Sequence, residues 1–197
     1  MAVKPILFNT EMVRAILDGR KDATRRIVKG FIPNDAVWGY TAFTPKGYIS
    51  CRGTFADGYG EKFFKLPCEP GNILYVRETW KKAPNGYYYY EDWQKNVIAD
   101  ITKWKPSIHM PKEAARIWLK VTDVRVERSQ EITIDGIRNE GISSMAVHAG
   151  DMEIALKEWK NLWNSTIKKT DLDRYGWNAN PWVWVIEFER CEKPEGV

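Results

Sequence analysis

The chain has 197 residues, of which 44% are hydrophobic and 13% are aromatic. This length and composition predict a single folded domain with its own core and exclude a disordered chain. The net charge of +4 is too small by itself to indicate a nucleic-acid-binding protein.

Cysteine and histidine content narrows the class of protein further. Cys51, Cys68 and Cys191 stand at unrelated spacings, without a Cys-x-x-Cys pair. An odd count of cysteines and the lack of a signal peptide indicate reduced thiols and a cytoplasmic protein, in a bacterium or a phage-infected host cell. His109 and His148 lie far apart in sequence, so we expect no metal site and no cofactor. No apolar run is long enough to cross a membrane, so we expect no membrane partner.

The first predicted elements are a short strand over residues 4–8 and a helix that continues to Asp18. Asn9 or Thr10 caps the start of the helix, because each offers a side-chain oxygen to the free backbone N–H groups. Gly19 supplies the left-handed residue that ends it.

The stretch from Gly19 to Arg26 carries the charge of the chain. Residues 1–30 hold seven Lys and Arg against three Asp and Glu, and this excess equals the net charge of the whole protein. We expect residues 20–26 to leave the helix as a turn, with an anionic partner bound nearby. The cations of the turn are Arg20, Lys21, Arg25 and Arg26.

Strand-like runs occupy much of the remaining chain. They cover residues 36–42 and 46–52, which form a predicted hairpin, and residues 63–66, 73–80, 87–90, 116–128 and 182–188. The last run is apolar on both faces at its start, which is typical of a central strand. The run Tyr87 to Tyr90 indicates either a platform on which nucleobases stack or a strand with both faces half covered.

Three helical segments follow residue 110. Pro111 suits the first turn of a short helix that reaches Ala115. Thr133 can cap a helix that ends at Gly141, and Asp151 begins the clearest amphipathic helix of the chain. The apolar face of that last helix is interpreted as core-facing. Its members are Met152, Ala155, Leu156, Trp159, Leu162 and Trp163.

These elements together predict an α+β fold. Short, irregularly spaced strands with few helices favour a small mixed or antiparallel β-barrel with flanking helices and inserted loops. Residues 1–197 are predicted to form one domain, because the sequence has no internal repeat and no interdomain linker.

The motif Gly19-x-Lys21-x-x-Thr24-x-Arg26 resembles the signature of the ASCH family, whose fold is a PUA-like β-barrel. The segment from Pro70 to Val76 and the closing strand agree with that family in order. Three further segments resemble a longer branch common in phage and prophage genomes; they are residues 4–8, 76–80 and 124–128. Compact members are little more than half this length, so the resemblance implies insertions near 27–69, 81–112 and 164–181.

The resemblance also implies a chemistry. A compact bacterial member is an amidohydrolase that removes acyl groups from the exocyclic amine of cytidine. Its proposed catalytic set matches Lys21, Thr24 and Glu140 here, the last in the helix after the long strand. Other members are reported as ribonucleases, and PUA-like domains bind RNA or modified bases. The implied partner is therefore a nucleoside, RNA or single-stranded nucleic acid.

The residues themselves support this chemistry without a metal. A threonine hydroxyl needs a neighbouring base, and Lys21 can serve only as a neutral amine. Lowering a lysine pKa from about 10.4 to near 7 corresponds to about 4–5 kcal/mol, which burial and nearby Arg20, Arg25 and Arg26 favour. Glu140 could carry the proton to the leaving amine, and a backbone amide or Arg26 could stabilise the oxyanion.

Two alternatives rest on the same residues. In the first, Arg20, Lys21, Arg25 and Arg26 bind phosphates, Thr24 caps the turn and Glu140 pairs with Lys21, in a binding module or a ribonuclease without amidohydrolase activity. In the second, a phage accessory protein binds a nucleotide or a host protein. Glu78 and Trp80, at the end of a predicted strand, are further substrate-binding candidates, although Trp80 also suits the core.

Overall fold

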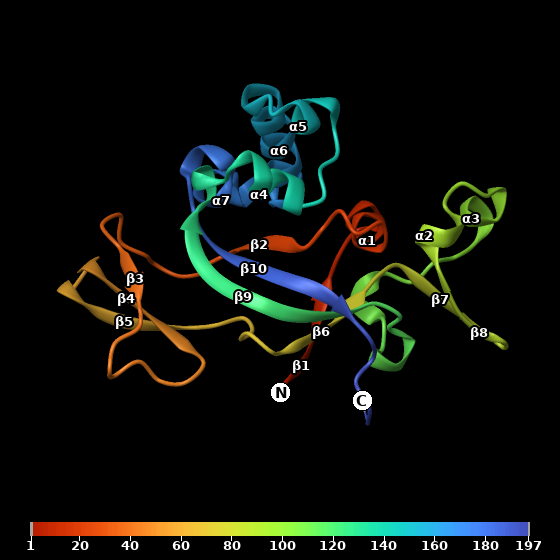
Figure 1. Cartoon of the computed structure of the whole chain (residues 1–197), viewed down its shortest axis with the longest axis horizontal. Helices are drawn as coiled ribbons and strands as arrows, with labels where there is room; N and C mark the ends of the chain where they lie inside the picture. The colour runs from red at the N-terminus through yellow and green to blue at the C-terminus, as the bar shows by residue number, and fades with distance from the viewer. Residues whose placement is uncertain (1, 197) are drawn as a thin grey trace.

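The computed structural model describes residues 2–196, apart from the side chain of Ile98, and is built on a mixed five-stranded sheet (Figure 1). In hydrogen-bonded order its strands are β1 (Val3–Leu7), β6 (Ile73–Arg77), β9 (Trp118–Arg128), β10 (Trp182–Cys191) and β2 (Ala23–Ile27). The pairing of β1 with β6 is parallel, and every other pairing in the sheet is antiparallel. The long strands β9 and β10 curve together through its centre (Figure 1).

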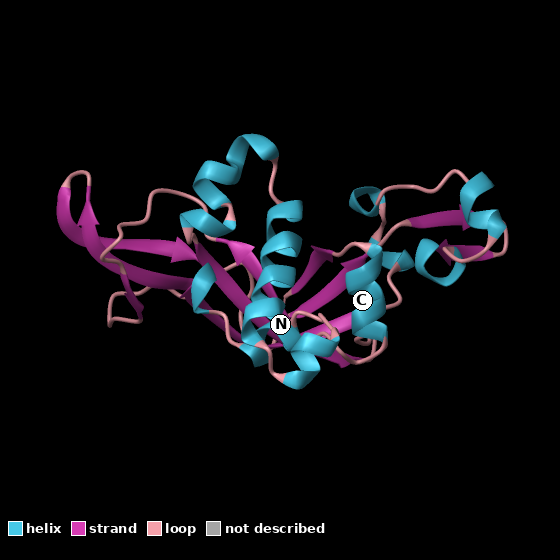
Figure 2. Ribbon diagram, turned by 90° about the horizontal axis from the view of Figure 1, so that it is seen from above, coloured by secondary structure: helices cyan, strands magenta, loops and turns pink. Residues whose placement is uncertain are grey.

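Two smaller sheets project from opposite ends of the molecule (Figures 1 and 2). One consists of β3 (Val37–Gly39), β4 (Tyr48–Phe55) and β5 (Gly58–Lys65), and the other of β7 (Trp80–Ala83) and β8 (Gly86–Tyr89). Both lie within segments for which the sequence predicts insertions. Their status as additions to a smaller domain stays a prediction.

The helices lie on one side of the central sheet or beside the two-stranded one (Figure 1). They are α1 (Thr10–Leu17), α2 (Tyr90–Trp93), α3 (Val97–Ile101), α4 (Ile134–Asn139), α5 (Met145–Ala149), α6 (Met152–Thr166) and α7 (Leu172–Tyr175). Short 3₁₀ turns occupy residues 107–109, 112–114, 129–131, 169–171 and 177–179. Within residues 2–196 no helix has the length and apolar character that a membrane crossing requires.

Helix α1 begins and ends where the sequence predicts. The Asn9 side chain accepts a hydrogen bond from the Met12 backbone N–H at 2.9 Å. Gly19 adopts a φ of +71°, which a residue without a Cβ reaches at low cost. Val13 and Ile16 are fully buried and fix α1 against the sheet. The cationic motif therefore starts at a defined helix end.

The prediction that residues 20–26 form a turn is wrong for its second half, because Ala23–Ile27 forms the edge strand β2. Thr24 lies opposite Ile186 and Arg25 opposite Val185 in an antiparallel ladder with β10. This pairing joins distant parts of the chain, so local composition does not reveal it. The strand fixes the direction in which each side chain of the motif points.

Strand β10 is central, as its apolar pattern predicts. Val183 and Val185 pack into the cluster that α4, α5 and α6 bury. Trp184, Ile186 and Phe188 pack into the main core on the opposite face. Because side chains alternate along a strand, a strand covered on both faces is apolar at successive positions.

The predicted α+β fold on a mixed sheet with flanking helices is confirmed, but the sheet does not close into the predicted barrel within the described residues. No ladder joins its edge strands β1 and β2 in the part of the chain that the structure describes. A side chain links them instead, since Arg26 Nη2 donates to the Leu7 carbonyl oxygen at 2.9 Å. The opening between these edges lies beside the cationic motif.

Two predicted strands differ in extent from those observed. The run over residues 73–80 divides into β6 and β7, because Glu78 leaves the sheet to form a buried ion pair with Arg116. The run over residues 63–66 is the end of a longer strand, β5, which begins at Gly58 and pairs with β4 along its whole length.

Candidate functional site

Lys21 and Glu140 form the buried ion pair at the centre of the candidate site. The Lys21 Nζ donates to Glu140 Oε2 at 2.7 Å, to the Glu140 carbonyl at 3.0 Å and to the Ala23 carbonyl at 2.7 Å. The two side chains are 1% and 5% exposed. Three acceptors around Nζ match the three N–H groups of an ammonium, so the resting geometry fits a charged Lys21.

Burial and charge act in opposite directions on this lysine. Burial lowers the pKa of the Lys21 amine below its ordinary value, while Glu140 raises it. Arg26 and Arg25 add to the lowering as neighbouring cations. Because of this burial, Lys21 loses its proton more easily than a lysine in water does.

Arg25 holds the other oxygen of Glu140. Its Nη1 lies 3.4 Å from Glu140 Oε1, and its Nη2 lies 3.3 Å from Glu127 Oε2 on β9. A Cβ at position 136 would lie 3.1 Å from Arg25 Nη2, so Gly136 on α4 leaves room for the guanidinium. The Arg25 Nε–H is buried and has no acceptor within the described residues. Glu140 is thus fixed between two cations.

Thr24, Lys21 and Glu140 line one small cavity of about 60 Å³. Thr24 is 2% exposed, and no hydrogen bond of its hydroxyl is found within residues 2–196. The structure therefore brings the three predicted catalytic residues together, and their catalytic roles stay predictions. The rest of the lining comes from α1, β2, α6 and the residues beside them: Phe8, Asn9, Met12, Arg25, Arg26, Trp159, Leu162, Trp163 and Thr166.

An open groove of about 460 Å³ adjoins this cavity. Met12 and Leu162 line both, so these two side chains separate the cavity from the groove. Arg20 lies in the groove, where it donates to the Gly141 carbonyl at 2.7 Å and pairs with Asp18.

Arg26 differs from its neighbour Arg25 in its surroundings. Arg26 is exposed as a residue, although burial of its guanidinium lowers the pKa, and the guanidinium lies 5.3 Å from the centre of the Phe8 ring. Its hydrogen bond to Leu7 joins β2 to β1, the two edge strands of the open sheet. Of the four predicted binding cations, Arg20 and Arg26 reach solvent, whereas Lys21 and Arg25 are buried.

Glu78 and Trp80 do not join this site. Both oxygens of Glu78 accept from Arg116 at 2.9 Å, and burial raises the pKa of Glu78 while Arg116 opposes that rise. Trp80 is 4% exposed and packs against Met110 and Ala114. Neither residue lines the cavity, and their predicted part in substrate binding stays a prediction.

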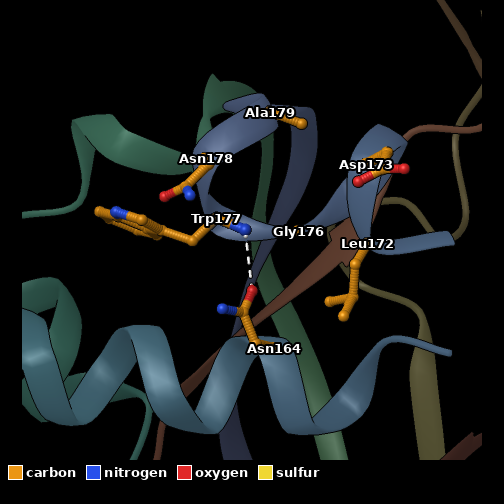
Figure 3. Close-up of a pocket in the computed structure, with 7 residues that line it drawn as sticks. All are labelled: Asn164, Leu172, Asp173, Gly176, Trp177, Asn178 and Ala179. Atoms are coloured by element: carbon orange, nitrogen blue, oxygen red, sulfur yellow. Dashed lines mark hydrogen bonds between the residues drawn. The ribbon is translucent and has the colours of Figure 1, made fainter. Parts of the chain in front are cut away.

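A second depression, of about 360 Å³, lies between α6 and the segment around α7 (Figure 3). The Asn164 side-chain oxygen accepts from the Trp177 backbone N–H at 2.9 Å across it (Figure 3). Asp173 is its one titratable lining residue, so the depression lacks a paired acid and base. Among the described residues, no group of three His, Cys, Asp or Glu side chains could hold a metal ion.

Sequence reasoning did not assign Glu127, Trp159 or Trp163 to the site. Glu127 reads as one charge in a strand of alternating charges, and only pairing across the sheet brings it to Arg25. The tryptophans stand four residues apart on α6, a spacing that predicts core packing, and they also form the cavity wall. A helix face that lines a cavity and a helix face that packs in the core have the same apolar spacing in the sequence.

No family model matches this chain, and no curated protein matches its sequence. A comparison with solved structures finds an ASCH domain from Lactobacillus crispatus JV V101. It is 11% identical, with a TM-score of 0.41, over 96% of this chain and 79% of the other. This is the family that the Gly19–Arg26 motif resembles. A similarity so distant assigns neither a substrate nor a site residue.

Proposed function

We propose that this protein is a metal-independent amidohydrolase that removes an acyl group from a modified nucleoside such as acylated cytidine. The observation that carries the proposal is the buried Lys21–Glu140 pair beside Thr24, at the wall of a single cavity. A nucleophile, a base and a second proton carrier on one cavity are the parts that amide hydrolysis requires.

The proposed reaction begins with proton transfer across the 2.7 Å contact, from the Lys21 ammonium to the Glu140 carboxylate. The neutral amine takes the Thr24 hydroxyl proton as Thr24 Oγ1 bonds to the acyl carbon. The bond from that carbon to the exocyclic nitrogen breaks, and the leaving amine receives a proton from Lys21. Water then hydrolyses the acyl-threonine ester, which restores the hydroxyl and releases a carboxylic acid.

In this proposal an arginine donates a hydrogen bond to the oxyanion of the tetrahedral intermediate. The buried Arg25 Nε–H, which has no acceptor among the described residues, and the Arg26 guanidinium are the candidates. A donor held by Glu140 and Glu127 before substrate arrives costs little reorganisation during the reaction.

The cavity is too small for a nucleoside as it stands. About 60 Å³ accommodates an acyl group of two carbons, whereas the adjoining groove has about 460 Å³. We infer that the nucleoside lies in the groove and that Met12 and Leu162 move apart to admit the acyl group. Rotamer changes of two such side chains are enough for this opening.

A role for the whole cationic motif in binding phosphates is less well supported. Lys21 and Arg25 are buried and already paired with carboxylates, so only Arg20 and Arg26 are placed to meet a phosphate in solution. Breaking either buried pair for a phosphate would leave a carboxylate without its partner, at a high cost in free energy.

The test is deacylation of N4-acetylcytidine by purified protein in the presence of a chelator, followed by chromatography. We expect turnover by the natural protein and a loss of about 100-fold or more in Lys21→Ala, Thr24→Ala and Glu140→Gln. Lys62→Ala, which removes an exposed cation on β5, is the matched control and should keep full activity. Folded protein that leaves acylated cytidines untouched, or a fully active Lys21→Ala, would refute the proposal.

A further inference from the structure

The segment of residues 80–112, here called the aromatic arm, has no part in the candidate site. It comprises the β7–β8 hairpin, α2, α3 and the chain that follows them, and it projects from one end of the molecule (Figures 1 and 2). Its inner face is anchored, because Trp80 packs on Met110 and Ala114 and the Tyr89 hydroxyl donates to the Ala114 carbonyl at 2.7 Å. Its outer face is free to meet a partner.

The arm presents partly exposed aromatic rings in fixed orientations. Tyr88 and Trp93 lie with ring centres 6.2 Å apart, and Tyr90 and Trp104 with ring centres 5.5 Å apart. All four residues are half-buried rather than core residues. Rings held by one another lose little freedom when a flat ligand stacks on them.

The same segment holds six lysines, and no ion pair within residues 2–196 neutralises them. They are Lys81, Lys82, Lys95, Lys103, Lys105 and Lys112, none of which has a carboxylate within ion-pair distance. The acidic residues of α2 are occupied elsewhere. Glu91 pairs with Arg14 at 2.7 Å, and Asp92 pairs with Arg116 at 2.8 Å. With Asp100 of α3 as its third acid, the arm holds six lysines against three carboxylates, so its surface charge is positive.

The hairpin register places a lysine beside a ring on the outer face. Lys81 lies directly opposite Tyr88 in the β7–β8 ladder. Trp80 and Tyr89, the neighbouring pair, point to the inner face, so Lys81 and Tyr88 point away from it. A cation and an aromatic face within one cross-strand pair can bind the phosphate and the base of one nucleotide.

We propose that the aromatic arm binds single-stranded nucleic acid, with Tyr88 and Trp93 stacking on bases and Lys81 contacting the backbone. Stacking surfaces interleaved with unpaired lysines are the features that bind single strands without sequence preference. The β3–β5 sheet at the other end also exposes rings, including Tyr59 at 76%, and places Tyr48 opposite Lys65 in its ladder, whereas its Lys62 is paired with Asp57. We place the binding on the arm because it combines the ring pairs Tyr88–Trp93 and Tyr90–Trp104 with six lysines that no ion pair within residues 2–196 neutralises.

The arm also connects to the candidate site. The Arg14–Glu91 pair joins α2 to α1, and Met12 of α1 lines the cavity. Arg14 itself lines the groove beside that cavity. The binding proposal stands without the hydrolase, since it uses none of the residues of that site.

The test is fluorescence anisotropy with labelled 20-mers of deoxythymidine and of uridine, at low and at raised salt. We expect binding to one or both that weakens steeply with salt. Tyr88→Ala and Lys81→Ala should each weaken binding about tenfold, and Lys81→Ala should also lower the slope of log K against log salt by about 1. Tyr88→Phe, which keeps the ring, should bind as the natural protein does.

Tyr59→Ala and Lys62→Ala provide the matched controls, because they remove the same side chains from the opposite end of the molecule. Circular dichroism checks that each variant is folded. No binding of either oligonucleotide at low salt, or equal losses in Tyr59→Ala and Tyr88→Ala, would overturn the proposal. Binding only to vesicles containing phosphatidylserine would overturn it in favour of a membrane surface, through the exposed Val97 and Ile101. Intact binding in a protein that fails to deacylate cytidines would uphold the arm and refute only the hydrolase.

Discussion

Lys21 and Glu140, which lie 119 positions apart, are joined both by a backbone β-bridge and by a side-chain ion pair of 2.7 Å. The bridge brings the end of α4 to the chain just before β2. The ion pair then fills the space between them with two charges that water does not reach. The same contact therefore closes the fold locally and assembles the acid and base of the proposed reaction.

Removing one partner of this pair should destabilise the protein strongly. Glu140→Ala leaves the Lys21 ammonium buried beside Arg25, and we expect a loss of about 3–5 kcal/mol in the free energy of unfolding. The double variant Lys21→Met/Glu140→Leu, which buries no charge, should lose less than half of that. Urea unfolding followed by tryptophan fluorescence measures both. Equal losses in the single and double variants would contradict a role for the unpaired charge.

The lysine also predicts a pH dependence of stability. Because burial lowers the pKa of Lys21 in the folded state, the unfolded chain binds more protons between that lowered pKa and the ordinary 10.5. The free energy of unfolding contributed by Lys21 therefore rises with pH across this window and is at its lowest below it. Relative to Lys21→Met/Glu140→Leu, the natural protein should gain stability as the pH approaches 10.5. If the free energy of unfolding of the natural protein, relative to that of the double variant, stays constant or falls with rising pH, the predicted pH dependence is wrong.

Gly141 should be intolerant of a side chain for two separable reasons. Its φ is +93°, and a Cβ there would lie 2.7 Å from the Ala15 Cβ and 3.1 Å from the Lys21 Cβ. Gly71 has a similar φ of +83°, but a Cβ there would meet nothing within 4 Å. We expect Gly71→Ala to cost about 1–2 kcal/mol from backbone strain, and Gly141→Ala about 1–3 kcal/mol more from the clash. Thermal unfolding measures the loss of stability in each variant, and the difference between the two losses is the cost of the clash. Equal losses would show that the clash costs nothing.

The three cysteines should differ in reactivity in the native protein. Burial raises the pKa of Cys51 and of Cys68 to about 11, and both thiols are almost completely inaccessible. Cys191 is half-buried at the end of β10, and burial raises its pKa as well. We expect Ellman's reagent at pH 8 to modify Cys191 first, and the other two only after denaturation. Cys191→Ser should abolish the fast phase, and three thiols reacting at one rate would disprove this arrangement.

Local signals in the sequence predict the helices but not the site strand. Asn9, Thr133 and Asp151 each cap a helix as their side chains suggest, because a cap is formed within four residues. Strand β2 depends on β10 at the far end of the chain, so its charged sequence reads as a turn. The break after Arg77 likewise depends on a distant residue, Arg116, which draws Glu78 out of the sheet.

The candidate site likewise contains residues that the sequence predicts and residues that only the folded structure reveals. Lys21, Thr24 and Glu140 can be proposed from a motif and its spacing, since each is a residue type that the chemistry requires. Arg25 reads as one more surface cation, and its burial against Glu140 and Glu127 becomes visible only when β2, α4 and β9 are brought together. Arg25 and Arg26 point to opposite faces because side chains alternate along β2, and a predicted turn gives no such alternation.

The pairing of β2 with β10 also sets the order of events during synthesis. The ribosome makes β2 early, whereas β10, its ladder partner, is the last of the described strands to emerge. Until then Arg25 has no sheet on which to lie, and the groups around Lys21 remain open to water. The candidate site of the nascent chain therefore stays unassembled through most of translation, and such long-range closure folds slowly.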